Sequence, residues 1–242
     1  MTTMNVRLKI KLIITIAAMT LVSAVSFGAT DEEVAKKMTT LYRSARGVIT
    51  ESISKMKTNP KAAGLNMKKA KKRVEKLYLA STGTKLTVDD EPSKKLMEAI
   101  DAVFTKAFAD GYADTWATAE HYPNKLLPAR FAREVGEELK KVSAGKYYIR
   151  LTVAPDCLVN SSNAPDTWEK DTIVKKLSQK SWKRNEGFSE TVGDSFRYIL
   201  PEYYAKGCLN CHGGAPGKAI HPKCSGTELG AFGGAISISI KK

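Results

Sequence analysis

The spacing of apolar residues changes near Gly145, and this change constrains the fold more than any other feature of the chain. Before Gly145, apolar residues recur every three or four positions, the period of a helix that buries one face; the first such stripe is Val34, Met38, Leu41, Ala45 and Val48. After Gly145, residues 146–153 mix aromatic and β-branched residues with polar ones, and residues 234–240 alternate cleanly. The first pattern is typical of a half-buried strand, and the second predicts the last strand of the chain. Helices followed by short antiparallel strands predict an α+β fold.

Capping and breaking residues indicate where the expected helices begin and end. Thr30 and Glu33 match a capping box at the start of the first helix. Asn59-Pro60 should end it, because the residue before a proline is pushed out of the helical region. Further helices are expected over residues 66–81, 92–108 and 126–142, with Gly145 ending the last, and over Asp166 to about Lys180. The remaining strands are expected at residues 187–193 and 194–200.

Residues 1–28 have the layout of a secretory signal. Arg7, Lys9 and Lys11 come first, an uncharged apolar run follows, and small residues precede a cut after Gly28. The alternative is an uncleaved membrane anchor, because the run only just reaches the length that spans a bilayer. In both cases we expect the rest of the chain to be periplasmic or otherwise exported.

The chain is strongly basic. Its net charge is +14, and three of these charges lie in the signal, which leaves +11 for the remainder. Export excludes nucleic acid, the usual partner of a basic protein. The charge then indicates plain solubility, and an acidic protein partner or the negative outer face of a membrane are the alternatives. Many lysines crowd into residues 66–81. Such a run typically forms a solvated helix face, and docking on an acidic protein partner is the alternative.

The stretch CLNCH at residues 208–212 carries the main chemical signal. A zinc site of this kind would need a second cysteine pair, and the two other cysteines of the chain are not paired in that way. A dithiol enzyme would place its two cysteines at a helix start within a βαβ unit. Haem attachment needs only two thiols at this spacing and an adjacent imidazole. We therefore predict one covalently bound haem c, with Cys208 and Cys211 as thioether anchors and His212 as the proximal iron ligand.

Four stretches within residues 120–240 read LLPARFAREVGEEL, NAPDTWEKD, FRYILPEYYAKGCLNCHGG and LGAFGGAISISI. In order and spacing they resemble the exported single-haem c-type proteins with a PAS-like haem domain, found alone or as sensing parts of histidine kinases and chemoreceptors. The resemblance implies an N-terminal helical region over 29–120 and a PAS-like haem domain over 121–242. It places Arg197 on the strand leading into the haem motif, as a candidate partner for a haem propionate, because a guanidinium pairs well with a carboxylate.

The sixth iron ligand is the open question. Members of the resembled family often carry a cysteine at the position of about Pro123, and in some that thiolate binds the iron. Here the nearest residue able to bind iron is His121, our first candidate. Cys157, His221 and an open sixth position are the alternatives. Cys157 and Cys224 are also a predicted disulfide pair, since both would be spare in an oxidising compartment.

The strength of the sixth ligand separates the candidate functions. A fixed ligand would suit an electron carrier or redox sensor, whereas a displaceable one would let NO or CO bind. We expect a redox or gas sensor that works through a protein partner, and the alternative is a periplasmic electron carrier that docks acidic redox partners. The apolar stripe of the first helix would serve a partner or a dimer unless it packs within the chain.

The remaining expectations concern catalysis and the membrane. The chain contains no recognisable nucleophile–base set, phosphate loop or carboxylate pair, so we do not expect an enzyme. Membrane association is expected only if the N-terminal segment is not cleaved.

Replacing His121 by alanine is expected to convert a six-coordinate low-spin haem to a high-spin one, because the distal imidazole would be lost. Absorption and electron paramagnetic resonance spectra of the oxidised protein measure this change, and His221→Ala is the matched control, expected to leave the spectra unaltered. An unaltered spectrum in the His121 variant would show that His121 is not the sixth ligand and would make Cys157 the next candidate.

Overall fold

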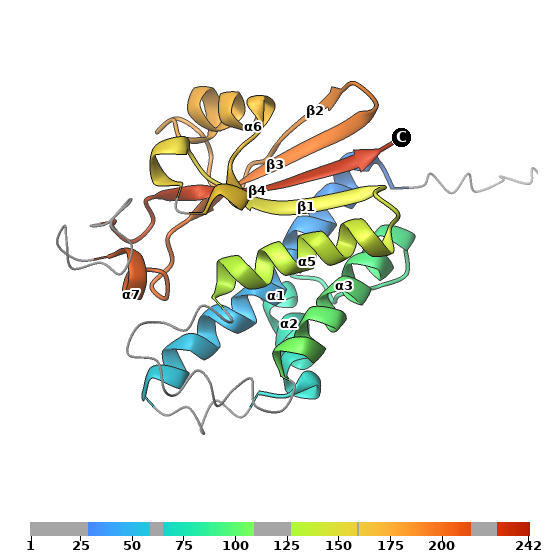
Figure 1. The fold of residues 1–242 in the computed structure, drawn as a ribbon, viewed down its shortest axis with the longest axis vertical. Coiled ribbons are helices and arrows are strands. Elements are labelled where there is room, and N and C mark those ends of the chain that lie inside the picture. Colours follow the sequence, from blue (N-terminus) through green and yellow to red (C-terminus); the bar gives the residue numbers. More distant parts are fainter. Residues whose placement is uncertain (1–28, 59–64, 109–126, 159, 214–226) are drawn as a thin grey trace, which may run out of the picture.

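A computed structural model describes residues 29–58, 65–108, 127–158, 160–213 and 227–242. The predicted signal and the residues His121, His221 and Cys224 lie outside these ranges. In Figure 1 one layer of helices lies beneath a sheet, and a shorter helical segment lies above it.

Four long helices form the first layer, and the predicted helices in this part of the chain are confirmed to within two residues at each end. They are α1 (Asp31–Thr58), α2 (Met67–Thr82), α3 (Glu91–Ala107) and α5 (Pro128–Val142).

Local hydrogen bonds explain where these helices start and stop. The predicted capping box is present: the Glu33 amide donates to Thr30 Oγ1 at 3.2 Å, and the Thr30 amide donates to Glu33 Oε2 at 2.8 Å. Asp90 caps α3 by accepting from the Ser93 amide at 2.7 Å. After α5, Gly145 has a φ of +80°, a conformation that glycine adopts at little cost, and its amide donates to Lys140 O at 2.7 Å.

Four antiparallel strands form a sheet in the order β1-β4-β3-β2, which confirms the α+β prediction. Their bounds are β1 (Tyr147–Thr152), β2 (Phe188–Val192), β3 (Ser195–Tyr203) and β4 (Phe232–Lys241). The last strand therefore lies between the first strand and β3.

The helix predicted from Asp166 to about Lys180 starts as expected but ends earlier. Asp166 and Glu169 form a complete capping box at the start of α6 (Thr167–Thr172). The segment continues as the π-helical turn η4 (Ile173–Leu177) and stops there. Its wider turn directs Ile173 and Leu177 onto the sheet, where both are buried.

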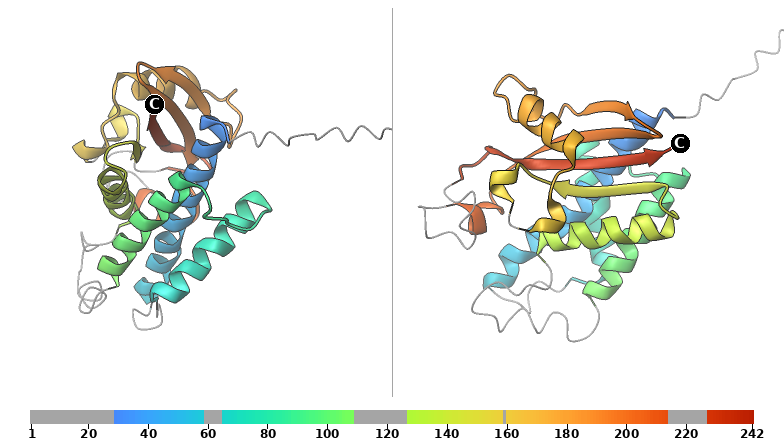
Figure 2. Two further views of the ribbon diagram at one scale, coloured as in Figure 1. Left: turned by 90° about the vertical axis from the view of Figure 1, so that its right-hand side faces the viewer. Right: turned by 45° about the horizontal axis from the view of Figure 1, so that its top comes forward.

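Side chains alternate along β3 between two cores on opposite faces of the sheet. Tyr198 and Leu200 belong to the large core shared with the long helices. Ile199 belongs to a small core that it forms with Ile173 and Leu177. The views in Figure 2 agree that the long helices cover one face, while α6 lies over the other.

The apolar stripe of α1 lies inside the large core. Met38, Leu41 and Ala45 have no exposed surface, and α1 contacts α2, α3, α5 and two strands. The stripe therefore packs within the chain, and a partner would have to use other surfaces. The same core contains residues of α1, α2 and α3, which precede residue 120, and residues of the sheet, which comes after it. The predicted domain boundary near residue 120 lies outside the described residues and stays a prediction.

The lysine-rich helix α2 presents a solvated face, as predicted. It buries Ala70, Val74 and Tyr78 against its neighbours. The six basic residues of the run are exposed: Lys68, Lys69, Lys71, Lys72, Arg73 and Lys76.

Among the described residues, Tyr42 is the largest side chain with no exposed surface, and its hydroxyl donates to Ala132 O at 2.8 Å. Burial raises the pKa of this phenol. Tyr42→Ala is expected to lower the free energy of unfolding by about 3–5 kcal/mol through the cavity it leaves, and Tyr42→Phe by about 1 kcal/mol through the lost hydrogen bond.

Urea denaturation followed by circular dichroism measures both changes. Leu79→Ala on α2 is the control, since Leu79 is 43% exposed, and its midpoint is expected to stay near that of the unmodified protein. Equal midpoints for Tyr42→Ala and Leu79→Ala would contradict the packing described above.

Candidate haem-attachment site

The CLNCH stretch forms a single helical turn after β3. This turn is α7 (Leu209–His212), and it is closed by the His212 amide, which donates to Cys208 O at 3.1 Å. Residues four apart on a helical turn lie on the same side, so Cys208 and His212 share one side of the turn. Figure 1 places α7 beyond the end of the sheet that lies away from the C-terminus.

The two cysteines with described side chains differ in state. Cys208 is a free, partly buried thiol, whereas Cys157, in the short turn η2 (Pro155–Cys157), is disulfide-bonded. This agrees with the predicted disulfide, although its predicted partner Cys224 lies outside the described residues. A disulfide sulfur is not a thiolate, so Cys157 in this state is not available as an iron ligand.

The His212 ring packs against an aromatic ring that the sheet positions. The centroid of the Tyr204 ring lies 5.2 Å from that of His212, with the ring planes at 42°. The Tyr204 backbone continues the sheet by hydrogen bonds to Ala231 and Gly230. A Cβ at Gly233 would lie 3.2 Å from the Tyr204 ring, so the missing side chain leaves room for it. Burial raises the pKa of the Tyr204 hydroxyl, and the neighbouring Cys208 acts in the same direction.

The chain before the motif lies directly on α1. A Cβ added at Gly207 would meet Thr50 Cγ2 at 3.0 Å, a distance that real Cβ contacts rarely reach. Gly207 therefore permits the motif to approach the helix. Thr50 lies one turn along α1 from Arg46, whose carbonyl accepts from the Thr50 hydroxyl at 3.2 Å.

Arg43, Arg46 and Glu202 form a partly buried ionic group between α1 and β3, which we call the arginine–glutamate cluster. Arg43 Nε donates to Glu202 Oε1 at 2.6 Å, and Arg43 Nη2 donates to Pro201 O at 3.2 Å. Arg46 Nη2 pairs with the other carboxylate oxygen, Glu202 Oε2. Burial lowers the pKa of Arg46, while Tyr42 and Cys208 oppose this effect.

Sequence reasoning missed this cluster. Arg43 and Arg46 are three residues apart on a helix whose buried positions are otherwise apolar or hydroxyl-bearing. The only local signal for the cluster was therefore this pair of arginines beside the apolar stripe. Their partner Glu202 is more than 150 positions away, so nothing local to α1 indicated it.

The residues present fit haem attachment of the c type. Cys208 is a thiol rather than half of a disulfide, and the same helical turn carries His212 and includes Cys211. Such attachment requires two thiols and an imidazole. The described side chains supply the Cys208 thiol and the His212 imidazole, while the side chain of Cys211 lies outside the described part of the structure.

The structure does not bring Arg197 together with Cys208 and His212. Arg197 pairs with Asp166 at 2.8 Å and Glu169 at 3.3 Å, and its guanidinium lies 4.6 Å from the centre of the Trp168 ring. These contacts place it on the α6 face, with Ile199. It is also six residues before the end of β3, roughly 20 Å along a strand. Its role as a propionate partner stays a prediction.

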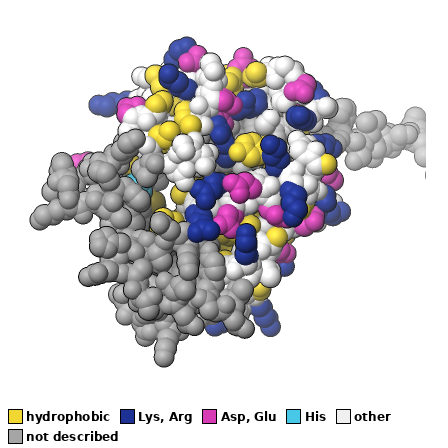
Figure 3. Space-filling model, in the orientation of Figure 1, with side chains coloured by type: hydrophobic (Ala, Val, Ile, Leu, Met, Phe, Trp, Pro, Cys, Tyr) yellow, Lys and Arg dark blue, Asp and Glu magenta, His cyan; other side chains and the backbone are white. Residues whose placement is uncertain are grey.

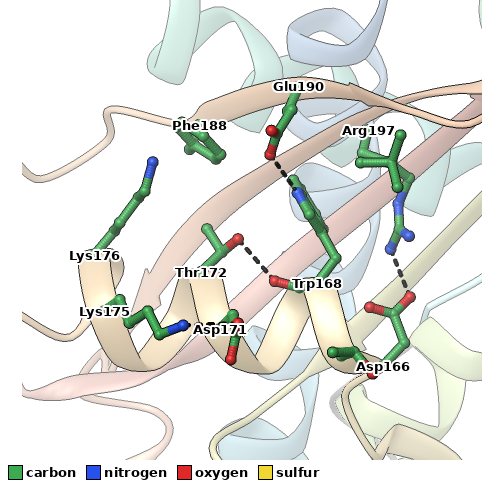
Figure 4. Close-up of a pocket in the computed structure, with 11 residues that line it drawn as sticks. Asp166, Trp168, Asp171, Thr172, Lys175, Lys176, Phe188, Glu190 and Arg197 are labelled. Atoms are coloured by element: carbon green, nitrogen blue, oxygen red, sulfur yellow. Dashed lines mark hydrogen bonds and ion pairs between the residues drawn. The ribbon is translucent and has the colours of Figure 1, made fainter.

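An open groove of about 590 Å³ lies beside Arg197 on that same face. Figure 4 shows Trp168 and Phe188 side by side, with Arg197 near one ring and Lys176 near the other. Trp168 Nε1 donates to Glu190 at 2.9 Å, and Lys175 pairs with Asp171 at 2.8 Å. Several polar groups of the groove thus pair with one another, while Arg197 Nε is buried and has no acceptor among the described residues.

The described surface carries charges of both signs. In Figure 3, Lys and Arg side chains are interspersed with Asp and Glu over the face in view. Among the helices of the described residues, none has a stretch both long and apolar enough to cross a membrane. The same residues contain no group of three or more His, Cys, Asp or Glu side chains arranged to hold a metal ion.

Glu202→Gln is expected to lower the free energy of unfolding by about 1.5–3 kcal/mol, because a partly buried carboxylate that accepts from two guanidinium groups would be lost. Urea denaturation measures the loss. Glu51→Gln is the matched control, since Glu51 pairs with Arg73 in an exposed setting and should contribute about 0–1 kcal/mol. Equal losses in the two variants would show that the cluster does not stabilise the fold.

A known protein family matches most of the chain. The sequence matches the Tll0287-like family over residues 28–241. A similar solved structure is that of the cyanobacterial heme-protein Tll0287, which is 18% identical and covers 64% of this chain and 97% of its own, with a TM-score of 0.38. No curated protein matches the sequence significantly. On the strength of the match over residues 28–241, the chain belongs to the Tll0287-like family.

Proposed function

We propose that this chain is an exported haem c protein in which Cys208 and Cys211 anchor the haem and His212 is the proximal iron ligand. The observation that carries the proposal is the free thiol of Cys208 on one helical turn with His212. Family membership supports it, because the family is named after Tll0287, which is described as a cyanobacterial heme-protein. The bound haem would supply one-electron redox chemistry and a site for diatomic gases.

The chain's own residues would orient the proximal histidine. Tyr204 restricts the plane of the His212 ring, and Thr227 donates a backbone hydrogen bond to His212 O at 3.1 Å. Gly207 and Thr50 hold the start of the motif against α1. These contacts involve groups that are already ordered by the sheet and by α1, so little reorganisation would accompany attachment.

We infer a sensing role, for redox state or for NO or CO, exercised through a protein partner. The supporting observation is that the motif contacts α1, which in turn contacts every other long helix. A displacement at the motif would therefore reach the whole helical layer. The second candidate, an electron carrier, is favoured by the net positive charge of the chain, which would assist transient docking on acidic partners.

Purified exported protein is expected to contain one haem per chain, resistant to extraction by acidified organic solvent, because thioether bonds are covalent. The pyridine haemochrome spectrum measures both the type and the amount of haem. Cys208→Ala should weaken the attachment, whereas Leu229→Ala, at an exposed position, is the control and should not. A fully extractable haem would rule out the proposal.

Gas binding by the purified protein distinguishes a gas sensor from an electron carrier or redox sensor. Titration of the reduced form with CO and NO is expected to change the absorption spectrum if the protein senses gases. A spectrum that does not respond to either gas would favour the electron carrier or a redox sensor.

A further inference from the structure

The arginine–glutamate cluster carries an unbalanced charge in a partly buried place. Arg43 and Arg46 share the single carboxylate of Glu202, whose side chain is only 12% exposed. Two guanidinium groups against one carboxylate leave one net positive charge. Partly buried charges are costly unless they are paired, so the cluster can accommodate one more anion.

The two arginines differ in the donors that they leave available. Arg43 uses Nε and Nη2 on Glu202 and Pro201. Arg46 pairs through Nη2, while its Nε is buried and has no acceptor within the described part of the chain. A buried guanidinium N–H that lacks an acceptor costs free energy. Arg46 is therefore the arginine with a donor left for an additional acceptor.

Arg46 also lies close to the haem motif. Gly207 packs on Thr50, the residue one turn along the same face of α1. The side chain of Cys208 is near enough to influence the Arg46 guanidinium electrostatically. An anion that arrives with a group attached at Cys208 would thus arrive near the Arg46 Nε donor.

We propose, on the basis of the haem c function above, that Arg46 binds a propionate carboxylate of the haem through its Nε. Every haem c carries two propionates, so the missing anion would come with the cofactor. Guanidinium–carboxylate contacts are among the stronger hydrogen-bonded pairs in proteins. The Nε of Arg197 is likewise buried and has no acceptor among the described residues. Arg46, rather than Arg197, then supplies this contact because Arg197 faces α6, on the opposite side of the sheet from α1 and Glu202.

Resonance Raman spectroscopy of the haem-loaded protein tests this contact, because the frequency of the propionate bending band depends on hydrogen bonds to the carboxylate. We expect Arg46→Gln to shift this band, and Arg43→Gln, which removes the same charge from the same cluster, to leave it in place. Both variants should lower the midpoint potential of the haem, since each removes a positive charge that disfavours the oxidised iron.

Arg46→Lys separates contact from charge. Lysine keeps the positive charge but lacks Nε, so the band should shift while the midpoint potential stays near that of the unmodified protein. If the Arg46→Gln protein does not fold, the propionate band of Arg46→Lys alone tests the contact. Arg197→Gln should leave the band unchanged.

An unshifted band in both haem-loaded Arg46 variants would overturn the assignment, as would a shift confined to Arg197→Gln. Absence of covalent haem from the unmodified protein is a different result: it would contradict the proposed function itself, and the pyridine haemochrome assay detects it independently.

Discussion

The burial of one face of α1 is the packing constraint on which the rest of the structure depends. Met38, Leu41 and Ala45 have no exposed surface, and fully burying an apolar side chain of the size of Leu or Met contributes about 1.5–3 kcal/mol. The other long helices and the sheet all contact α1. Its polar edge carries Arg46 and Thr50, so the helix that organises the core also contacts the segment that leads into the CLNCH motif.

The alternation of side chains along β3 assigns the two faces of the sheet to different tasks. Tyr198 and Leu200 face the long helices, and Glu202 joins the same side through its pairs with Arg43 and Arg46. Arg197 faces α6, where Asp166 and Trp168 hold it. Arg197 on one face of β3 and Glu202 on the other thus lie on opposite sides of the sheet, and the α6 groove is separated from the Arg43 and Arg46 side.

Much of the fold was predictable because its signals are local. The capping box of Thr30 and Glu33 and the positive-φ glycine Gly145 each act within a few residues, and the structure follows both. The alternating isoleucines of β4 likewise all belong to the large core. The end of the helix that starts after Asp166 was predicted wrongly, because its π-helical turn is set by contact with the sheet. Propensity within the segment does not encode that contact.

By itself, the sequence determined the order of helices and strands and the spacing of the CLNCH motif, since these depend on periodicity, capping and separation along the chain. Only the tertiary structure decided which charged residues lie near the motif. Arg46 and Glu202 are paired although they are 156 positions apart, and Arg197, much nearer to Cys208 in sequence, faces α6 on the other side of the sheet. The physical reason is that strand alternation and helix packing set proximity in space, and neither can be read from separation along the chain.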